Sequence, residues 1–187
     1  MDNVTYQLDD LFFVIATQNP LDLAGTYPLP SAQLDRFLFK IRMHHVDRDS
    51  EIQVLQTYRQ RRDTQRNDLP RVTRSQVFQA RRVVDQVRID DEIKECLVDV
   101  ARALRADERV LQGASTRSMV LMMPALQARA TLHGRDYVSG EDIEDLALYV
   151  FGHRIDLAPG VTNVAEVLKE VSAQPLERLS RSTLRRR

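Results

Sequence analysis

The 187-residue sequence has a single cysteine and therefore cannot form an internal disulfide. Cys96 lies in the apolar stretch ECLVDVA, whose spacing is typical of a buried helix face. This position favours a packing role for Cys96 over a nucleophilic one.

No charge of one sign prevails, and no long hydrophobic run is present. The 27 Lys and Arg residues balance 27 Asp and Glu residues, which argues against a general binder of nucleic acids or membrane surfaces. No apolar stretch approaches the roughly 18–20 residues that cross a bilayer. The first ten residues (MDNVTYQLDD) are acidic and lack the apolar core of a secretory signal. We therefore expect a cytoplasmic protein that does not insert into a membrane.

Common catalytic and cofactor motifs are also missing. None of the six glycines begins or ends a Gly-x4-Gly-Lys-Ser/Thr phosphate loop. The stretch VRIDDE resembles a Mg²⁺-binding hydrophobic-Asp-Glu box, but Arg88 interrupts its apolar run and Asp90 fits a helix cap better. The four histidines lack metal-ligand spacing, and no Gly-x-Ser-x-Gly elbow or Cys/His nucleophile pair is visible.

The pattern of apolar residues divides the chain into two parts. Residues 11–16 (LFFVIA) form an apolar run typical of a strand buried on both faces. Residues 37–43 (FLFKIRM) alternate with the period of a strand, and a short helix is expected before them. After Asp47 the pattern becomes helical. About 45 residues thus look like the end of an α/β domain, and the rest like a helical bundle.

The helical part predicts a series of capped amphipathic helices. They are expected from about Asp49 to Arg62, after a capping box at Thr73, after a cap at Asp90, over residues 116–133, and after a cap at Ser139. Pro124 is expected to kink one of them. A weaker helix is expected from Asn163 to about Val171. The residues expected to face the core are Val77, Ala80, Val84, Val87, Ile93, Leu97, Ala101, Leu104, Ile143, Leu146, Ala147 and Val150. The last twelve residues carry five Arg and one Glu and predict a solvated tail.

Three polar residues lie where phosphate-binding groups are expected. Asn19 follows a buried strand, where open α/β sheets place ligand-contacting groups, but a turn before Pro20 explains it equally well. Arg36 precedes the second strand, and its guanidinium suits phosphate recognition across a subunit boundary. Chemistry alone favours a surface pair with Asp35. Arg117 lies in the first turn of a helix, where a cation suggests an anionic partner.

Four sequence blocks, in order, carry a family resemblance. Residues 16–41 (ATQNPLDLAGTYPLPSAQLDRFLFKI) closely resemble the second half of the nucleotide-binding domain of MoxR-type AAA+ ATPases. GASTRS (113–118), HGRDYVSGEDI (133–143) and FGHRIDL (151–157) resemble segments of that family's helical lid. The resemblance implies a mainly α fold, in which a helical AAA+ lid bundle follows a two-strand remnant of the α/β AAA+ core. The implied parts are the core remnant (1–46), the lid domain (47–171) and a basic tail (172–187).

The resemblance also implies roles for the three polar residues. Asn19 matches sensor 1, which orients the attacking water near the γ-phosphate. Arg36 matches the arginine finger, which reaches the ATP of a neighbouring subunit. Arg117 matches sensor 2, which contacts phosphate from the lid. The family is similar to magnesium-chelatase ATPase subunits, uses ATP and Mg²⁺, and forms rings, commonly hexamers. It is thought to act as chaperones that assist maturation or metal insertion in partners, often with a von Willebrand factor A domain.

One departure from the family bears on activity. The family's phosphate loop and Mg²⁺-binding carboxylates precede the matched region, and these 187 residues contain neither. We therefore expect the chain to be the C-terminal portion of a MoxR-like ATPase, to bind no cofactor alone and to hydrolyse no ATP alone. The alternative is a non-catalytic helical module that docks on a ring ATPase or a partner. The two predicted strands would also lose their sheet neighbours; they would pair together, pair with another chain, or remain non-native.

Overall fold

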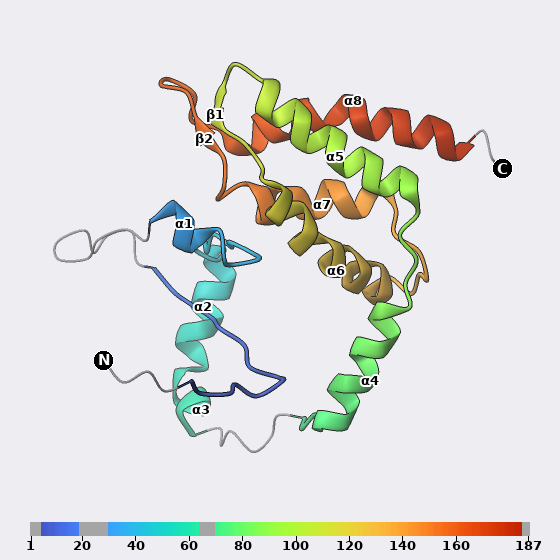
Figure 1. The fold of residues 1–187 in the computed structure, drawn as a ribbon. Coiled ribbons are helices and arrows are strands. Elements are labelled where there is room, and N and C mark those ends of the chain that lie inside the picture. The colour runs from blue at the N-terminus through green and yellow to red at the C-terminus, as the bar shows by residue number, and fades with distance from the viewer. Residues whose placement is uncertain (1–4, 19–29, 64–69, 185–187) are drawn as a thin grey trace. The chain divides into compact units, whose positions relative to one another are not determined.

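A computed structural model describes residues 5–18, 30–63 and 70–184. The chain divides into two compact units, Met1–Pro30 and Ser31–Arg187. All described helices and strands lie in the second unit (Figure 1). The helices are α1 (Ser31–Leu34), α2 (Arg48–Gln56), α3 (Tyr58–Asp63), α4 (Arg74–Asp85), α5 (Asp91–Ala106), α6 (Thr116–Leu132), α7 (Gly140–Phe151) and α8 (Val164–Leu184), and the strands are β1 (Val110–Gln112) and β2 (Asp156–Leu157). The prediction of a mainly α fold is therefore confirmed.

Caps define where the central helices begin and end. At α4, the Thr73 hydroxyl accepts a hydrogen bond from Gln76 N, and the Gln76 side chain accepts one from Thr73 N, which forms the predicted capping box. Asp90 is the N-cap of α5, but its carboxylate makes no capping bond and pairs with Arg88 instead, at 3.0 Å. After α6, Gly134 adopts a φ of 69°, a left-handed conformation that favours glycine and ends the helix.

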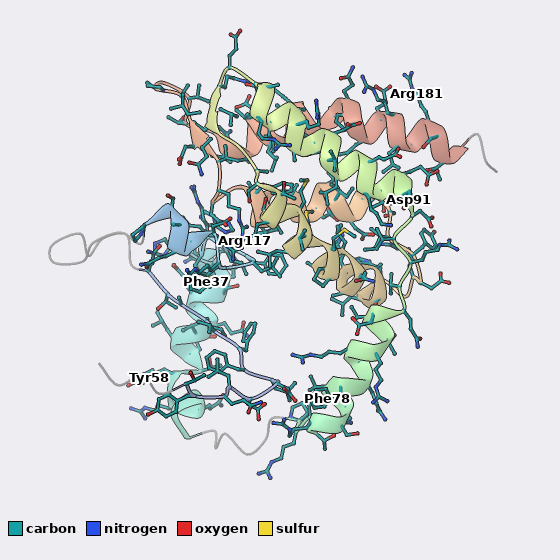
Figure 2. All side chains as sticks on the ribbon, in the orientation of Figure 1. Phe37, Tyr58, Phe78, Asp91, Arg117 and Arg181 are labelled. Carbon is teal, nitrogen blue, oxygen red and sulfur yellow. The ribbon has the colours of Figure 1, made fainter. Side chains whose placement is uncertain are left out.

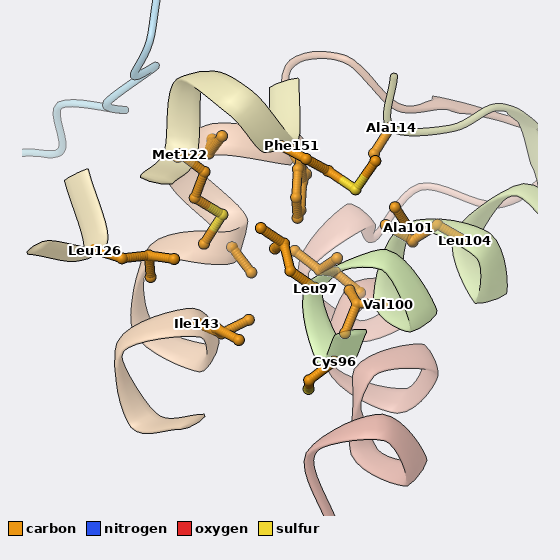
Figure 3. Close-up of a cluster of buried hydrophobic side chains, with 14 of the residues drawn as sticks. Cys96, Leu97, Val100, Ala101, Leu104, Ala114, Met122, Leu126, Ile143 and Phe151 are labelled. Atoms are coloured by element: carbon orange, nitrogen blue, oxygen red, sulfur yellow. The ribbon is translucent and has the colours of Figure 1, made fainter. Parts of the chain in front are cut away.

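The hydrophobic core lies among α5, α6, α7 and α8 (Figure 3). The α5 stripe predicted from spacing is confirmed, because its four members are all buried. The side chains of Leu104, Met122, Leu126, Ile143 and Phe151 are fully buried. Burying one such side chain contributes roughly 1.5–3 kcal/mol. These four helices therefore have an apolar core of their own.

The helices before this core are less buried than their patterns predict. On α4, Ala80 is exposed and Val77 and Val84 are half-buried, while Val87, just beyond the helix, is buried. The reason is that α4 packs mainly against α6 among the described helices, so one neighbour covers part of its face. The single helix predicted from about Asp49 is broken at Thr57, whose hydroxyl donates to the Gln53 carbonyl.

The strands predicted at residues 11–16 and 37–43 are not formed in the structure. In the first unit, Phe12 N donates to Asp9 O at 2.8 Å in a turn, and Phe13 and Ile15 are exposed. In the second unit, Lys40 N donates to a carbonyl of α7. A strand is stabilised by a ladder with a neighbour, and neither segment has one among the described residues. The described sheet instead pairs β1 and β2 antiparallel, with elements too short for periodicity to reveal.

The last helix is longer than predicted. Rather than ending near Val171, α8 continues to Leu184 and packs against α5 and α7 (Figure 1). Ser172 and Leu179 are buried, so this part of α8 belongs to the bundle, and the solvated tail predicted for the last twelve residues is wrong for residues 176–184. Neither α8 nor any other described helix combines the length and apolar character that membrane crossing requires.

Candidate functional site

Arg36 lies in a short turn that directly follows α1. The turn is closed by backbone hydrogen bonds from Asp35 N to Ser31 O at 2.9 Å and from Phe37 N to Leu34 O at 3.0 Å. The Arg36 side chain is exposed, and no described residue forms a hydrogen bond or ion pair with it. The surface pair with Asp35 that simple chemistry favoured is therefore not present. Arg36 offers a guanidinium that is available to a ligand.

Arg154, which follows α7, holds this turn through hydrogen bonds. Its guanidinium Nε donates to Asp35 Oδ1 at 2.7 Å, and Nη2 donates to Asp35 O at 2.9 Å and Phe37 O at 2.7 Å. Nη1 contacts Leu38 O at 3.4 Å and also donates to Val150 O. A guanidinium has five N–H donors, so every donor of this buried side chain has an acceptor.

Arg117 approaches the same turn from the start of α6. Ser115 caps this helix by accepting a hydrogen bond from Ser118 N at 3.2 Å, which places Arg117 in the first turn. Arg117 Nη1 lies 3.8 Å from Asp35 Oδ2, and Figure 2 shows Arg117 near Phe37. At 63% exposure the Arg117 side chain remains open to solvent. Asp35 thus presents one carboxylate oxygen to each of two arginines.

His153 supplies another contact to the turn. Its Nε2 lies 3.1 Å from Phe37 O, while Nδ1 is buried without a partner. Burial and the neighbouring positive charge of Arg154 lower the pKa of His153. The neutral ring with its proton on Nε2 donates to this carbonyl.

Two of the three predicted site residues, Arg36 and Arg117, lie close to Asp35 in the structure, and the roles of all three stay predictions. Arg36 directly follows Asp35 in sequence, and Arg117 Nη1 lies 3.8 Å from the Asp35 carboxylate. Asn19 lies outside the described residues. The sequence patterns did not indicate Arg154 and His153 as site contacts, although both belong to the FGHRIDL block that carried the family resemblance. Their partners are more than a hundred residues away in sequence, and no spacing rule shows such contacts.

No group of three or more His, Cys, Asp or Glu residues in the described part of the chain is placed to hold a metal ion. Arg154 and His153 contact the Arg36 turn itself, and the arginines that the site exposes are Arg36 and Arg117. Such a set suits an anionic ligand, because guanidinium groups bind phosphate and carboxylate oxygens through paired hydrogen bonds. The site therefore fits a phosphate group better than a cation.

Cys96 is expected to be inert in the folded protein. Burial, with a smaller contribution from Asp99, raises its pKa to about 11, so almost no reactive thiolate is present at neutral pH. A thiol-reactive chromophore should label Cys96 in denaturant and leave it unlabelled for hours in native buffer. Rapid labelling of the native protein would contradict its placement in the core.

Comparisons with known proteins match both parts of the chain. Residues 1–39 match the ATPase family associated with various cellular activities (AAA), and residues 102–172 match the AAA lid domain. The chain is 43% identical over 159 residues to the uncharacterized protein YeaC of Bacillus subtilis, covering 85% of this chain and 49% of YeaC. It is 32% identical over 171 residues to the chaperone MoxR1 of Mycobacterium tuberculosis, covering 82% of this chain and 42% of MoxR1.

A crystal structure of a proposed ATPase from Cytophaga hutchinsonii has the same fold. It superposes with a TM-score of 0.79 at 30% identity, covering 89% of this chain and 54% of that one. The chain thus spans about half the length of these relatives. The fold and the two family matches define it as part of an AAA-type ATPase that includes the lid. Within that class, the chain belongs to the MoxR-type AAA+ ATPases.

Proposed function

We propose that this chain supplies the arginine finger, Arg36, and the sensor 2 residue, Arg117, of an ATP-hydrolysing ring. The observation that carries the proposal is that Arg36 is exposed and has no side-chain partner among the described residues. It lies on a turn held by a buried arginine, with Arg117 facing the same turn. A finger must leave its own subunit to reach a phosphate, so its side chain has to be free.

Arg117 serves the nucleotide of its own subunit in this proposal. Its ion pair with Asp35 is long and solvent-exposed, and such pairs contribute only about 0–1 kcal/mol. Exchanging this contact for a phosphate oxygen therefore costs little. Asn19 is proposed as sensor 1, with support from the family resemblance alone.

The ring is proposed to bind ATP with Mg²⁺ and to be a hexamer. The cellular role we propose is chaperone-like maturation of a client protein, which includes metal insertion and a client with a von Willebrand factor A domain. The relative from M. tuberculosis is named a chaperone, which supports the general role. The metal and the client rest on the family resemblance, and the cytoplasmic location stays a prediction from sequence.

ATP hydrolysis by the 187 residues alone is expected to be at background. They contain no phosphate-loop motif, and without one the finger and sensor residues have no bound nucleotide to act on. The measurement is phosphate release and ATP binding by purified 1–187, with the Asn19→Ala variant as control. Turnover that disappears in Asn19→Ala would contradict this expectation.

The positive test uses a polypeptide in which a phosphate-loop half of a MoxR-type ATPase precedes residues 1–187, here called the complete ATPase. We expect it to assemble into rings and hydrolyse ATP. Assembled rings without turnover would count against the proposed function and favour the alternative, a helical docking module without catalysis. That alternative draws support from the separate apolar core of α5–α8.

A further inference from the structure

We propose that Arg154 is a positioning residue for Arg36. It fixes the backbone on both sides of Arg36 while leaving that side chain free. The functional consequence rests on the role proposed for Arg36, whereas the structural claim stands on the contacts of Arg154 alone. Nothing in the sequence blocks or the family matches assigns such a role to Arg154.

The distribution of hydrogen bonds supports this assignment. Of the five acceptors around the Arg154 guanidinium, four belong to Asp35, Phe37 and Leu38. These residues flank Arg36 in sequence, while none of the hydrogen bonds of Arg154 involves Arg36 itself. The Arg154 side chain is only 3% exposed, so its bonds are shielded from competing water. Arg154 therefore holds the backbone beside Arg36 and makes no contact with the Arg36 side chain that an ATP phosphate would compete with.

Two further contacts hold the same segment to the end of α7. His153 Nε2 lies 3.1 Å from Phe37 O, and Lys40 N donates to Tyr149 O at 3.0 Å. These contacts lack the charge and the multiple donors of the Arg154 contact. Arg154 combines one charge-assisted bond to the Asp35 carboxylate with further bonds to backbone carbonyls, so we assign the main share of the anchoring to Arg154.

Asp35 is bound more closely by Arg154 than by Arg117. Arg154 Nε is 2.7 Å from Oδ1 and buried, whereas Arg117 Nη1 is 3.8 Å from Oδ2 and exposed. A buried, short pair is costly to break, and an exposed, long one is not. The Asp35 carboxylate therefore stays with Arg154 when Arg117 leaves. The Arg117 side chain can therefore turn toward a nucleotide without releasing the finger turn.

Amide hydrogen exchange of the full 187-residue chain tests the structural claim. In Arg154→Lys, one ammonium cannot span the five acceptors, so exchange at Phe37 and Lys40 should become about tenfold faster or more. Amides in α5 should keep their protection. The matched control is Arg117→Ala, which removes the other partner of Asp35 and should leave exchange at Phe37 and Lys40 unchanged.

Three results would overturn the proposal. One is unchanged exchange at Phe37 and Lys40 in a folded Arg154→Lys protein. Another is an equal acceleration in Arg117→Ala, which would move the anchoring to the other arginine. If the amides of α5 also lose protection in Arg154→Lys, that variant is unfolded and the test passes to Asp35→Ala. Asp35 is suitable because its half-buried side chain lies outside the core. Asp35→Ala must then accelerate exchange at Phe37 and Lys40 alone, and unchanged exchange would be the third contrary result.

The complete ATPase tests the functional consequence separately. Arg154→Lys should lower kcat by about 10–100-fold with little change in the KM for ATP, because a misplaced finger affects the transition state more than binding. A raised KM at unchanged kcat would contradict a role in positioning Arg36. Should Arg36→Ala leave turnover intact, the proposed function fails, while the exchange result still decides whether Arg154 holds the turn.

Discussion

Arg36→Ala is expected to lower the kcat of the complete ATPase by about 10³–10⁵-fold and to leave its affinity for ATP nearly intact. An arginine finger neutralises charge that develops on the transferred phosphoryl group, so its loss is felt mainly in the transition state. Steady-state kinetics gives kcat, and equilibrium binding of a labelled nucleotide gives the affinity. The matched control is Arg42→Ala, which removes another exposed arginine six residues further along and should leave kcat within about twofold.

If Arg36 acts across a subunit boundary, two inactive variants should complement each other in a mixed ring. Mixing Arg36→Ala subunits with subunits that lack the phosphate-loop Lys should restore part of the turnover. Some interfaces of a mixed ring then combine an intact finger with an intact phosphate loop. If mixed rings form and remain inactive, Arg36 does not act in trans. By contrast, Arg117→Ala should weaken ATP binding within its own subunit, and mixing should not repair that defect.

The helical core could be predicted from local sequence patterns because its signals are local. The capping boxes at Thr73 and Ser139 and the apolar stripe of α5 require only residues three or four positions apart. The extent of α8 could not be predicted so well. Its arginines and Pro175 weaken the helical pattern beyond Val171, but packing of Leu179 in the bundle supports a helix there.

The strand predictions failed for a different physical reason. The apolar patterns of residues 11–16 and 37–43 describe a buried environment, and a sequence cannot show whether the neighbouring strands are present. In the candidate site, Arg117 was predictable as a cation in the first turn of a helix, whereas Arg36 was singled out by the family resemblance. Their shared contact with Asp35 and the anchoring by Arg154 are tertiary contacts. Only the folded chain could reveal these contacts.

Asp142 combines a helix cap with a buried ion cluster that sequence spacing only partly indicated. Its carboxylate is fully buried and accepts hydrogen bonds from Ser139 N at 2.8 Å and from Arg135 Nη2 and Nη1 at 2.6 and 2.9 Å. Arg129 Nε lies 3.3 Å away. The capping residue of α7 therefore also neutralises two arginines that follow or end α6.

Asp142→Asn is expected to lower the free energy of unfolding at neutral pH by about 3–5 kcal/mol, because it leaves the partly buried Arg135 without its main counter-charge. Urea unfolding followed by circular dichroism gives this value. The matched control is Asp145→Asn on the same helix, which removes an exposed partner of Arg129 and should change stability by less than about 1 kcal/mol.

The difference in the free energy of unfolding between wild type and Asp142→Asn should depend on pH if the charge of Asp142, and not its shape, stabilises the fold. Burial alone would raise the pKa of Asp142, but the hydrogen bonds from Arg135 and Ser139 outweigh it and hold the pKa below its ordinary value of 3.8. The unfolded chain thus takes up the proton more readily than the folded one. The stabilisation is then complete above the unfolded pKa and is lost as the pH falls through the folded one. The gap between wild type and Asp142→Asn should therefore be constant from about pH 7 to pH 5 and narrow below about pH 4. A gap that stays the same in acid would show that the substitution acts through lost shape or capping geometry and not through the charge.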